Sequence, residues 1–187
     1  MFADLKSADK DGFRPILRSL TAERDNLSPV GGHINVCYGK EWYRYPSSFF
    51  LPSSDRYRMR FIRSDFRGQL PKLQENNPNL RGLPTRIIHT DFNDMNKEEI
   101  TRYVRPEECH YLIDSSQKTT SENEPDYSKS IKDWKILSTH RMLDLHNSPI
   151  VIRSFYLPYI SEKQNSYTEY RLLRNNNLFI QSEGERP

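Results

Sequence analysis

Short apolar runs separated by long polar connections constrain the fold of this chain most strongly. Five runs have the length and residue content of β-strands, at 33–39, 56–63, 109–116, 133–143 and 166–174. Because long connections allow neighbouring strands to run parallel, a purely hairpin-built sheet is not required. We predict an α/β fold, a single domain with a small mixed, partly parallel sheet of about five strands and a few short helices.

The run at 56–63, RYRMRFIR, shows the clearest strand pattern, because arginines alternate with aromatic and apolar residues. A period of two predicts a half-buried strand with one solvated face. A row of guanidinium groups can also meet an anionic partner. An anion or nucleic-acid binder that uses Arg56, Arg58 and Arg60 is therefore a third, weaker hypothesis.

Helices are expected to be few and to lie at the ends of the strands. The segment SPIVIRSFYLPYI, 148–160, has a Ser-Pro start of the capping type and predicts a helix that ends near Pro158. A shorter helix is expected to begin at Pro46. Residues 1–32 form a polar leader and 176–187 a frayed tail, which leaves the α/β domain at 33–175.

Composition limits the classes of protein to consider. The chain of 187 residues contains 9 Phe and 11 Tyr, which argues against general disorder. Its net charge of +3 is mild for a nucleic-acid binder, and no nucleic-acid partner is expected. No apolar run approaches the roughly 18 residues that a membrane span needs, and the first residues lack the apolar core of a signal peptide. The residues by themselves indicate a cytosolic protein.

The usual catalytic and metal-binding motifs are missing from the sequence. Glycine-rich nucleotide loops, a GxSxG elbow and HExxH are all absent, and the five histidines are scattered. No metal and no cofactor are predicted. The two cysteines, Cys37 and Cys109, each lie within an apolar strand-like run, which slightly favours two buried thiols over a disulfide.

The richest candidate binding surface is 39–45, the first half of the stretch GKEWYRYPSSFFLP (39–52), together with Arg67. Aromatic rings there offer flat faces for a sugar or base, and charged side chains supply directional hydrogen bonds. The alternative is an aromatic anchor that packs a helix on the sheet, which the residues alone favour. The candidate substrate contacts are Lys40, Glu41, Trp42, Arg44 and Arg67.

The string VCYGKEWYRYPSSFFLP, 36–52, resembles a segment near the C-terminus of the endoplasmic-reticulum α-1,2-mannosyltransferases of N-glycan assembly, in glycosyltransferase family 22. The resemblance continues through FIRSDFRGQLPK, TRIIHTDFNDMN, RYVRPEECHYLID and IRSFYLPYIS, in the same order. It covers roughly 34–174.

The resemblance to this family implies an activity and partners that the residues by themselves do not. Enzymes of this family are multi-pass membrane proteins that move mannose from dolichyl-phosphate-mannose to the lipid-linked oligosaccharide, and their general base lies in an early luminal loop. This chain is then expected to be the C-terminal luminal domain, with no catalytic residue of its own. Its expected partners are the membrane-embedded catalytic part of the enzyme and the lipid-linked oligosaccharide acceptor.

The same resemblance changes the expected compartment and the expected state of the cysteines. The luminal side of the endoplasmic-reticulum membrane is oxidising, so a disulfide between Cys37 and Cys109 gains support if their strands are neighbours. The remaining alternative is a non-catalytic glycan-binding or scaffolding module, in which the aromatic residues of 39–52 serve as core or interface.

Overall fold

The computed structural model describes residues 19–20, 32–40, 48, 51, 56–73, 90–116 and 121–178. It contains one sheet of five strands among these residues. The strands are β1 (Ile34–Tyr38), β2 (Tyr57–Phe61), β3 (Tyr111–Ser115), β4 (Trp134–Leu143) and β5 (Tyr167–Asn175). Each lies within one of the five runs predicted from the sequence or extends it by a single residue.

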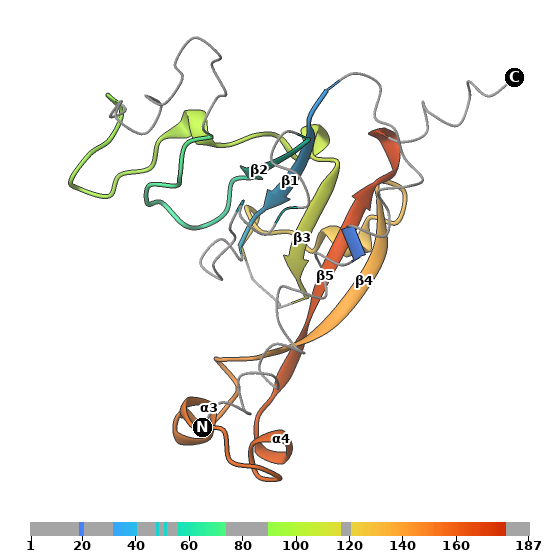
Figure 1. Cartoon of the computed structure of the whole chain (residues 1–187). Helices are drawn as coiled ribbons and strands as arrows, with labels where there is room; N and C mark the ends of the chain where they lie inside the picture. The colour runs from blue at the N-terminus through green and yellow to red at the C-terminus, as the bar shows by residue number, and fades with distance from the viewer. Residues whose placement is uncertain are drawn as a thin grey trace, which may run out of the picture.

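The sheet is mixed, and its strand order is β2-β1-β3-β5-β4 (Figure 1). Strand β1 runs parallel to both β2 and β3, while β5 runs antiparallel to both β3 and β4. The parallel half consists of β2, β1 and β3, and the antiparallel half contains the β4–β5 hairpin. The predicted fold class, a partly parallel sheet of about five strands with few helices, is confirmed.

Both faces of the central strands are covered, because successive residues point to opposite sides. On one face, Val36, Tyr111 and Leu172 belong to the larger core cluster, which also includes the fully buried Leu20. On the other face, Leu112 and Leu173 pack with Trp134 in a smaller cluster. All five residues of β3 are buried, as expected for a strand in the middle of a sheet.

A disulfide joins Cys37 on β1 to Cys109, just before β3. The two Cα atoms are 5.8 Å apart, and both cysteines are fully buried in the smaller cluster. This distance is typical of disulfides, and the parallel pairing of β1 with β3 brings the two residues together. The structure therefore contains the pairing that the family resemblance favoured, and not the two free thiols that composition favoured.

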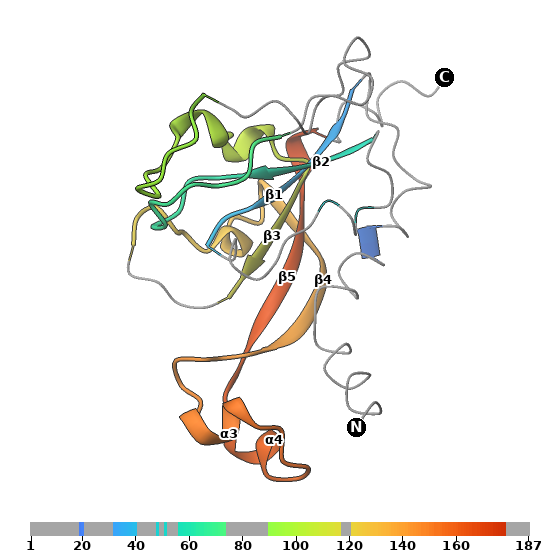
Figure 2. The ribbon, with the colours of Figure 1, turned by 60° about the vertical axis from the view of Figure 1, so that its left-hand side comes forward.

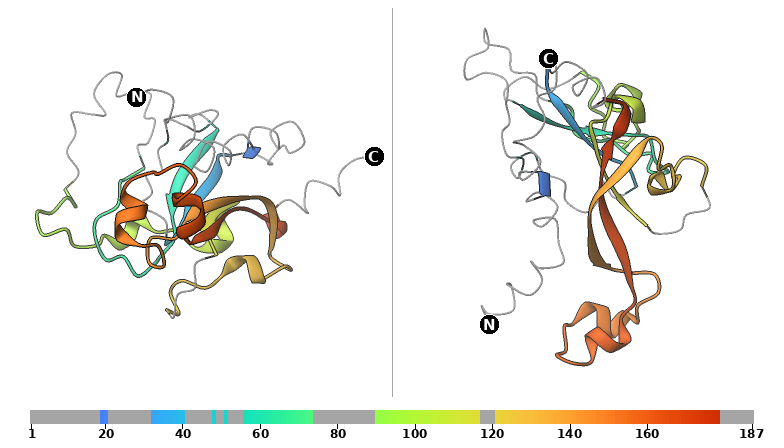
Figure 3. Two further views of the ribbon diagram at one scale, coloured as in Figure 1. Left: turned by 90° about the horizontal axis from the view of Figure 1, so that it is seen from below. Right: turned by 90° about the vertical axis from the view of Figure 1, so that its right-hand side faces the viewer.

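The β4–β5 hairpin extends beyond the rest of the sheet and carries two short helices at its end (Figures 1 and 2). These are α3 (Ile150–Ser154) and α4 (Ser161–Gln164). The right-hand view in Figure 3 also shows both helices away from β1 and β2. A register shift between Ile136 and Ser138 marks a bulge in β4, a feature that bends and twists a strand.

The prediction of one helix over 148–160 is wrong in its length and its cap. Helix α3 ends at Ser154, and the chain continues in extended backbone at Phe155. The Ser148 hydroxyl does not cap α3, since it donates to the backbone oxygen of Ser166 and accepts from the backbone N–H of the same residue. Tyr159 has a positive φ of 67°, which no helix accommodates.

Three single 3₁₀ turns also lie among the described residues. They are η4 (Ile100–Arg102), η5 (Pro106–Glu108) and η6 (Tyr127–Lys129). No helix in the described part of the chain is long and apolar enough to cross a membrane. The helix expected from Pro46 lies outside the described residues.

His110 gives the fold a dependence on pH. Its Nδ1 accepts a hydrogen bond of 3.1 Å from the Asn35 N–H, and burial lowers the pKa of its imidazole below the ordinary value of 6.5. As the pH falls below about 6.5, the unfolded chain binds a proton before the folded chain does. We expect the free energy of unfolding to decrease from that pH down to the pKa of folded His110.

The measurement is urea denaturation between about pH 7 and pH 5, above the range where most carboxylates titrate. His110→Asn keeps an oxygen acceptor for Asn35 and should flatten the dependence. His146→Asn, at an exposed position, is the matched control and should leave the slope unchanged. If the free energy of unfolding of His110→Asn still fell with pH as steeply as that of the unaltered chain, His110 would not be the source of the pH dependence.

Candidate functional site

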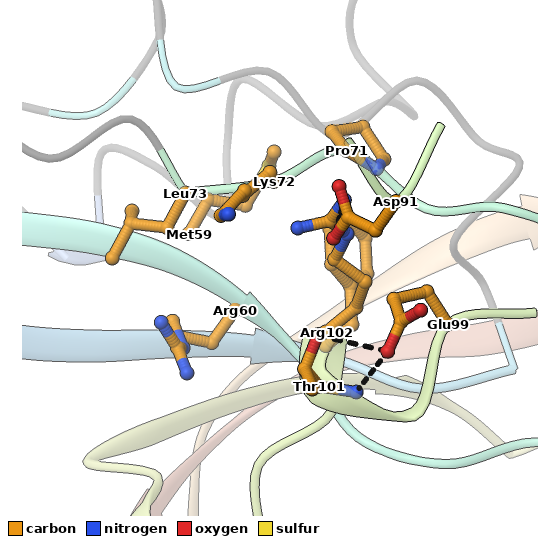
Figure 4. A pocket seen from close by; sticks show the side chains of 10 residues that line it. Met59, Arg60, Pro71, Lys72, Leu73, Asp91, Glu99, Thr101 and Arg102 are labelled. Carbon is orange, nitrogen blue, oxygen red and sulfur yellow. Dashed lines mark hydrogen bonds and ion pairs between the residues drawn. The ribbon is translucent and has the colours of Figure 1, made fainter. Parts of the chain in front are cut away.

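A pocket of about 500 Å³ lies beside β2, which forms one edge of the sheet (Figure 4). This volume falls within the range of small-molecule sites. Its lining is a mixture of charged, hydroxyl and apolar side chains. The lining residues are Met59, Arg60, Phe61, Pro71, Lys72, Leu73, Asp91, Glu99, Thr101 and Arg102.

Three segments that are distant in the sequence assemble this pocket. Strand β2 supplies one side, the loop after it supplies 71–73, and the segment 91–102 closes the third side. An isolated parallel bridge joins Phe61 to Tyr103, and the Val104 N–H donates to the Phe61 oxygen at 2.8 Å. This pairing holds η4, and with it Arg102, beside the outer edge of β2.

The loop FRGQLP, 66–71, positions the acidic side of the pocket. The Gln69 side chain donates to the Asp91 backbone oxygen at 3.1 Å, and the Gln69 N–H donates to Asn96 Oδ1 at 2.9 Å. The turn depends on Gly68, because a Cβ there would lie 2.2 Å from the Phe66 ring and 2.8 Å from Asn96 Nδ2. The string that carries the family resemblance therefore builds the pocket wall.

Arg102 and Asp91 form an ion pair at the centre of the lining. Arg102 Nη2 lies 2.7 Å from Asp91 Oδ2, and the Arg102 side chain is only 8% exposed. Burial by itself raises the pKa of Asp91, but a backbone hydrogen bond and the charges of Arg102 and Lys72 outweigh it, and the pKa is lowered. Asp91 is therefore an ionised hydrogen-bond acceptor at neutral pH.

Several polar atoms of the lining are buried without a hydrogen-bond partner among the described residues. They are Arg60 Nε, Asp91 Oδ1 and Arg102 Nε. Buried polar groups are normally paired, so these atoms are an exception that other atoms of the same side chains, which line the pocket, do not explain. Glu99 differs, since its Oε1 accepts from the Thr101 N–H and hydroxyl (Figure 4).

The chemistry of this pocket suits a neutral ligand rich in hydroxyl groups. Arginine N–H groups donate and the carboxylate accepts, while the apolar side chains Met59, Phe61 and Leu73 can contact the carbon face of a ring. No group of three His, Cys, Asp or Glu side chains within the described ranges is placed to hold a metal ion.

The structure places Lys40 at the end of β1, in a buried ion pair. Its Nζ lies 3.5 Å from Asp114 Oδ1 on the neighbouring strand β3, with exposures of 6% and 5%. Ends of parallel strands often position functional side chains. Glu41, Trp42 and Arg44, which follow Lys40, lie outside the described residues.

Arg67 lies on the loop that builds the pocket wall and contacts a different acidic residue. Its Nη1 is 3.4 Å from Glu98 Oε2, which also accepts from the Tyr103 hydroxyl at 3.2 Å. Burial and this hydrogen bond raise the pKa of Tyr103. The described contacts thus attach Lys40 and Arg67 to separate partners and do not join them.

Sequence reasoning noticed Arg60, and it noticed Asp91 only as one half of an acidic pair with Asp94. The missed polar lining residues are Lys72, Glu99, Thr101 and Arg102. Their spacing matches no compact motif, because the pocket forms only when three segments meet. The available signal was the resemblance itself, since 61–72, 85–96 and 102–114 all carry it and all contribute lining residues.

Comparisons with known proteins agree on one group of relatives. The chain is 44% identical over 146 residues to the human "Alpha-1,2-mannosyltransferase ALG9", a match that covers 78% of the chain and 23% of the human protein. It is 40% identical over 173 residues to the Caenorhabditis elegans "Alpha-1,2-mannosyltransferase algn-9", covering 87% and 28%. The Saccharomyces cerevisiae "Alpha-1,2-mannosyltransferase ALG9" is 35% identical over 131 residues, covering 67% and 22%.

The chain spans about a quarter of the length of the curated relatives it matches. No family model matches the chain. No solved structure matches it either.

Proposed function

We propose that this chain, whose matching segment belongs to the ALG9 family of alpha-1,2-mannosyltransferases, forms the C-terminal luminal domain of an endoplasmic-reticulum mannosyltransferase. The identity of 44% over 146 residues is the observation that carries this proposal. The enzyme transfers mannose from dolichyl-phosphate-mannose to the lipid-linked oligosaccharide of protein N-glycosylation. The transfer itself belongs to the membrane-embedded catalytic part, and these 187 residues have no activity alone.

The disulfide supports a luminal location. Disulfides persist in the endoplasmic-reticulum lumen and are rare in the reducing cytosol. Cys37 and Cys109 are joined and fully buried. The domain is therefore assigned to the luminal side of the membrane, where the lipid-linked oligosaccharide is completed.

The pocket beside β2 is proposed to bind the acceptor oligosaccharide. Each mannose presents hydroxyl groups that both donate and accept hydrogen bonds. Asp91, Arg60 and Arg102 all line the pocket, where a carboxylate can accept from such hydroxyl groups and guanidinium groups can donate to them. Together they orient the glycan, while the chemical step takes place elsewhere in the enzyme.

The residues predicted from the sequence have supporting roles in this proposal. The Lys40–Asp114 ion pair fixes the end of β1, and Glu41, Trp42 and Arg44 are proposed as further contacts to the acceptor. Arg67 is held by Glu98 and remains 43% exposed, so its guanidinium is available to an acceptor. Lys40 acts by positioning, since its own side chain is buried.

Asp91→Asn tests the proposal, in a full-length enzyme whose matching segment is replaced by this chain. The amide cannot accept hydroxyl groups as a carboxylate does, and loss of one charged hydrogen bond weakens binding by about tenfold. We expect the KM for the lipid-linked oligosaccharide to rise by about this factor, with kcat and the KM for dolichyl-phosphate-mannose unchanged. The measurement is mannose transfer at varied acceptor concentration.

Asp126→Asn is the matched control. Asp126 is also an ion-paired aspartate with 23% side-chain exposure, but its partner Arg171 is on β5 and neither residue lines the pocket. The control should leave the acceptor KM unchanged. If both variants lower the amount of protein equally and neither changes KM, the domain is the scaffolding module of the alternative hypothesis.

A further inference from the structure

The end of the β4–β5 hairpin exposes a continuous group of apolar and aromatic side chains. The residues with most of their surface in solvent include Ile150 at 70%, Phe155 at 67% and Tyr159 at 85%. Val151, Tyr156, Leu157 and Ile160 are exposed as well. We call these seven residues the hairpin tip. Contiguous exposed apolar residues of this kind indicate an interaction surface.

The tip is a folded structure held by its own hydrogen bonds. The Arg153 guanidinium donates to the Leu145 backbone oxygen. The Ser161 hydroxyl accepts from the Leu157 N–H at 2.8 Å and donates to the Phe155 oxygen at 3.3 Å. The side chains therefore stay outward in the native fold.

Tyr159 adds to this arrangement. It is a non-glycine residue with a φ of 67°, a left-handed conformation that costs a tyrosine free energy. In return the chain keeps the Tyr159 ring, 85% exposed, at the end of the molecule.

Position and charge favour a lipid bilayer over a protein as the occupant. Figure 1 and the right-hand view of Figure 3 show α3 and α4 at the far end of the β4–β5 hairpin, away from the rest of the sheet. A bilayer can receive such an end without a matching surface of its own. The only charged residue in 150–160 is Arg153, which is positive and complements anionic lipid headgroups.

The residue types also match the bilayer interface. Tyrosine places its ring among the headgroups while its hydroxyl stays hydrated, and Ile, Val, Leu and Phe reach the acyl chains. We propose that the hairpin tip inserts into the interfacial layer of a phospholipid bilayer. This inference does not rest on the proposed function, because it derives only from the exposed residues of 150–160.

Membrane contact through the tip leaves the pocket accessible. The tip extends from β4 and β5, and β4 forms the edge of the sheet opposite β2. The pocket lies beside β2. The hairpin thus holds the domain at the bilayer surface, while the domain's polar pocket lies at the opposite edge of the sheet.

The test is flotation of the 187-residue chain with phosphatidylcholine vesicles, with and without phosphatidylserine. The chain should float with vesicles, more strongly when phosphatidylserine is present. Phe155→Ser/Tyr159→Ser removes two exposed rings and should reduce the vesicle partition coefficient by about tenfold. Because both rings are exposed in the folded chain, the urea midpoint should not change.

Ile131→Ser provides the matched control, since Ile131 is 81% exposed but precedes β4 at the other end of the hairpin. It should float like the unaltered chain. The proposal is overturned if the unaltered chain does not float, or if the double variant and the control float equally. It is also overturned if the two tip substitutions abolish self-association of the chain without vesicles, because the tip then binds a second copy.

Discussion

Replacing Cys37 and Cys109 together with alanine is expected to lower the free energy of unfolding by about 4 kcal/mol. The disulfide closes a long loop, with a sequence separation of 72 residues, and stabilisation grows with the length of the closed loop. It also joins β1 to the start of β3, the pairing on which the parallel half of the sheet depends. The measurement is urea denaturation of the oxidised chain and of the double variant.

Reduction of the unaltered chain supplies the control for this result. The reduced chain keeps both sulfur atoms in the core, so it separates loss of the cross-link from loss of packing. The reduced chain should lose most of the unfolding free energy that the double alanine variant loses. A difference below about 1 kcal/mol between oxidised and reduced chains would show that the cross-link is not a main source of stability.

Asp114→Ala is expected to cost about 3–5 kcal/mol of unfolding free energy, because it leaves the charge of Lys40 buried without its partner. Both side chains are nearly inaccessible, at 6% and 5% exposure. Lys40→Met should also destabilise the fold. The double variant should lose less than the sum of the two single losses, since it leaves no uncompensated charge at this pair.

The Arg105–Glu108 pair is the matched control for the buried pair. Its nitrogen and oxygen are closer, at 2.8 Å, but its side chains are 79% and 45% exposed. Glu108→Ala should therefore cost less than about 1 kcal/mol. If Asp114→Ala and Glu108→Ala lost equal amounts of unfolding free energy, burial would not be what makes the Lys40–Asp114 pair important. If the losses of the Lys40 and Asp114 variants added strictly in the double variant, the two residues would not interact.

The strands could be predicted because each carries its own local signal. Alternating residues marked β2, and the continuous apolar run YLI within 109–116 matched a strand buried on both faces. The bulky runs in β4 and β5 were long enough to pair as a hairpin. The lengths of the connections allowed a partly parallel sheet but did not decide which pairs are parallel, since 144–166 joins the antiparallel β4 and β5 and is longer than 39–56, which joins the parallel β1 and β2.

The helix over 148–160 could not be corrected from sequence, because its apolar residues have the composition of a buried helix. Their exposure depends on where the hairpin ends, which is a property of the assembled sheet. The polar pocket was hidden for a related reason. Asp91 and Arg102 are 11 positions apart and meet only because the Gln69 side chain and the bridge at Phe61 hold their segments against β2.

The sheet order also sets when this domain can fold during its synthesis. The last strand, β5, lies between β3 and β4, although it is made after both. Until the ribosome has released residue 175, β3 has a partner on one side only and β4 has none in the sheet. The antiparallel pairs β3–β5 and β4–β5 must therefore wait for the final segment. A product that stops before Tyr167 lacks an internal strand of the sheet, and β4 then has no strand to pair with.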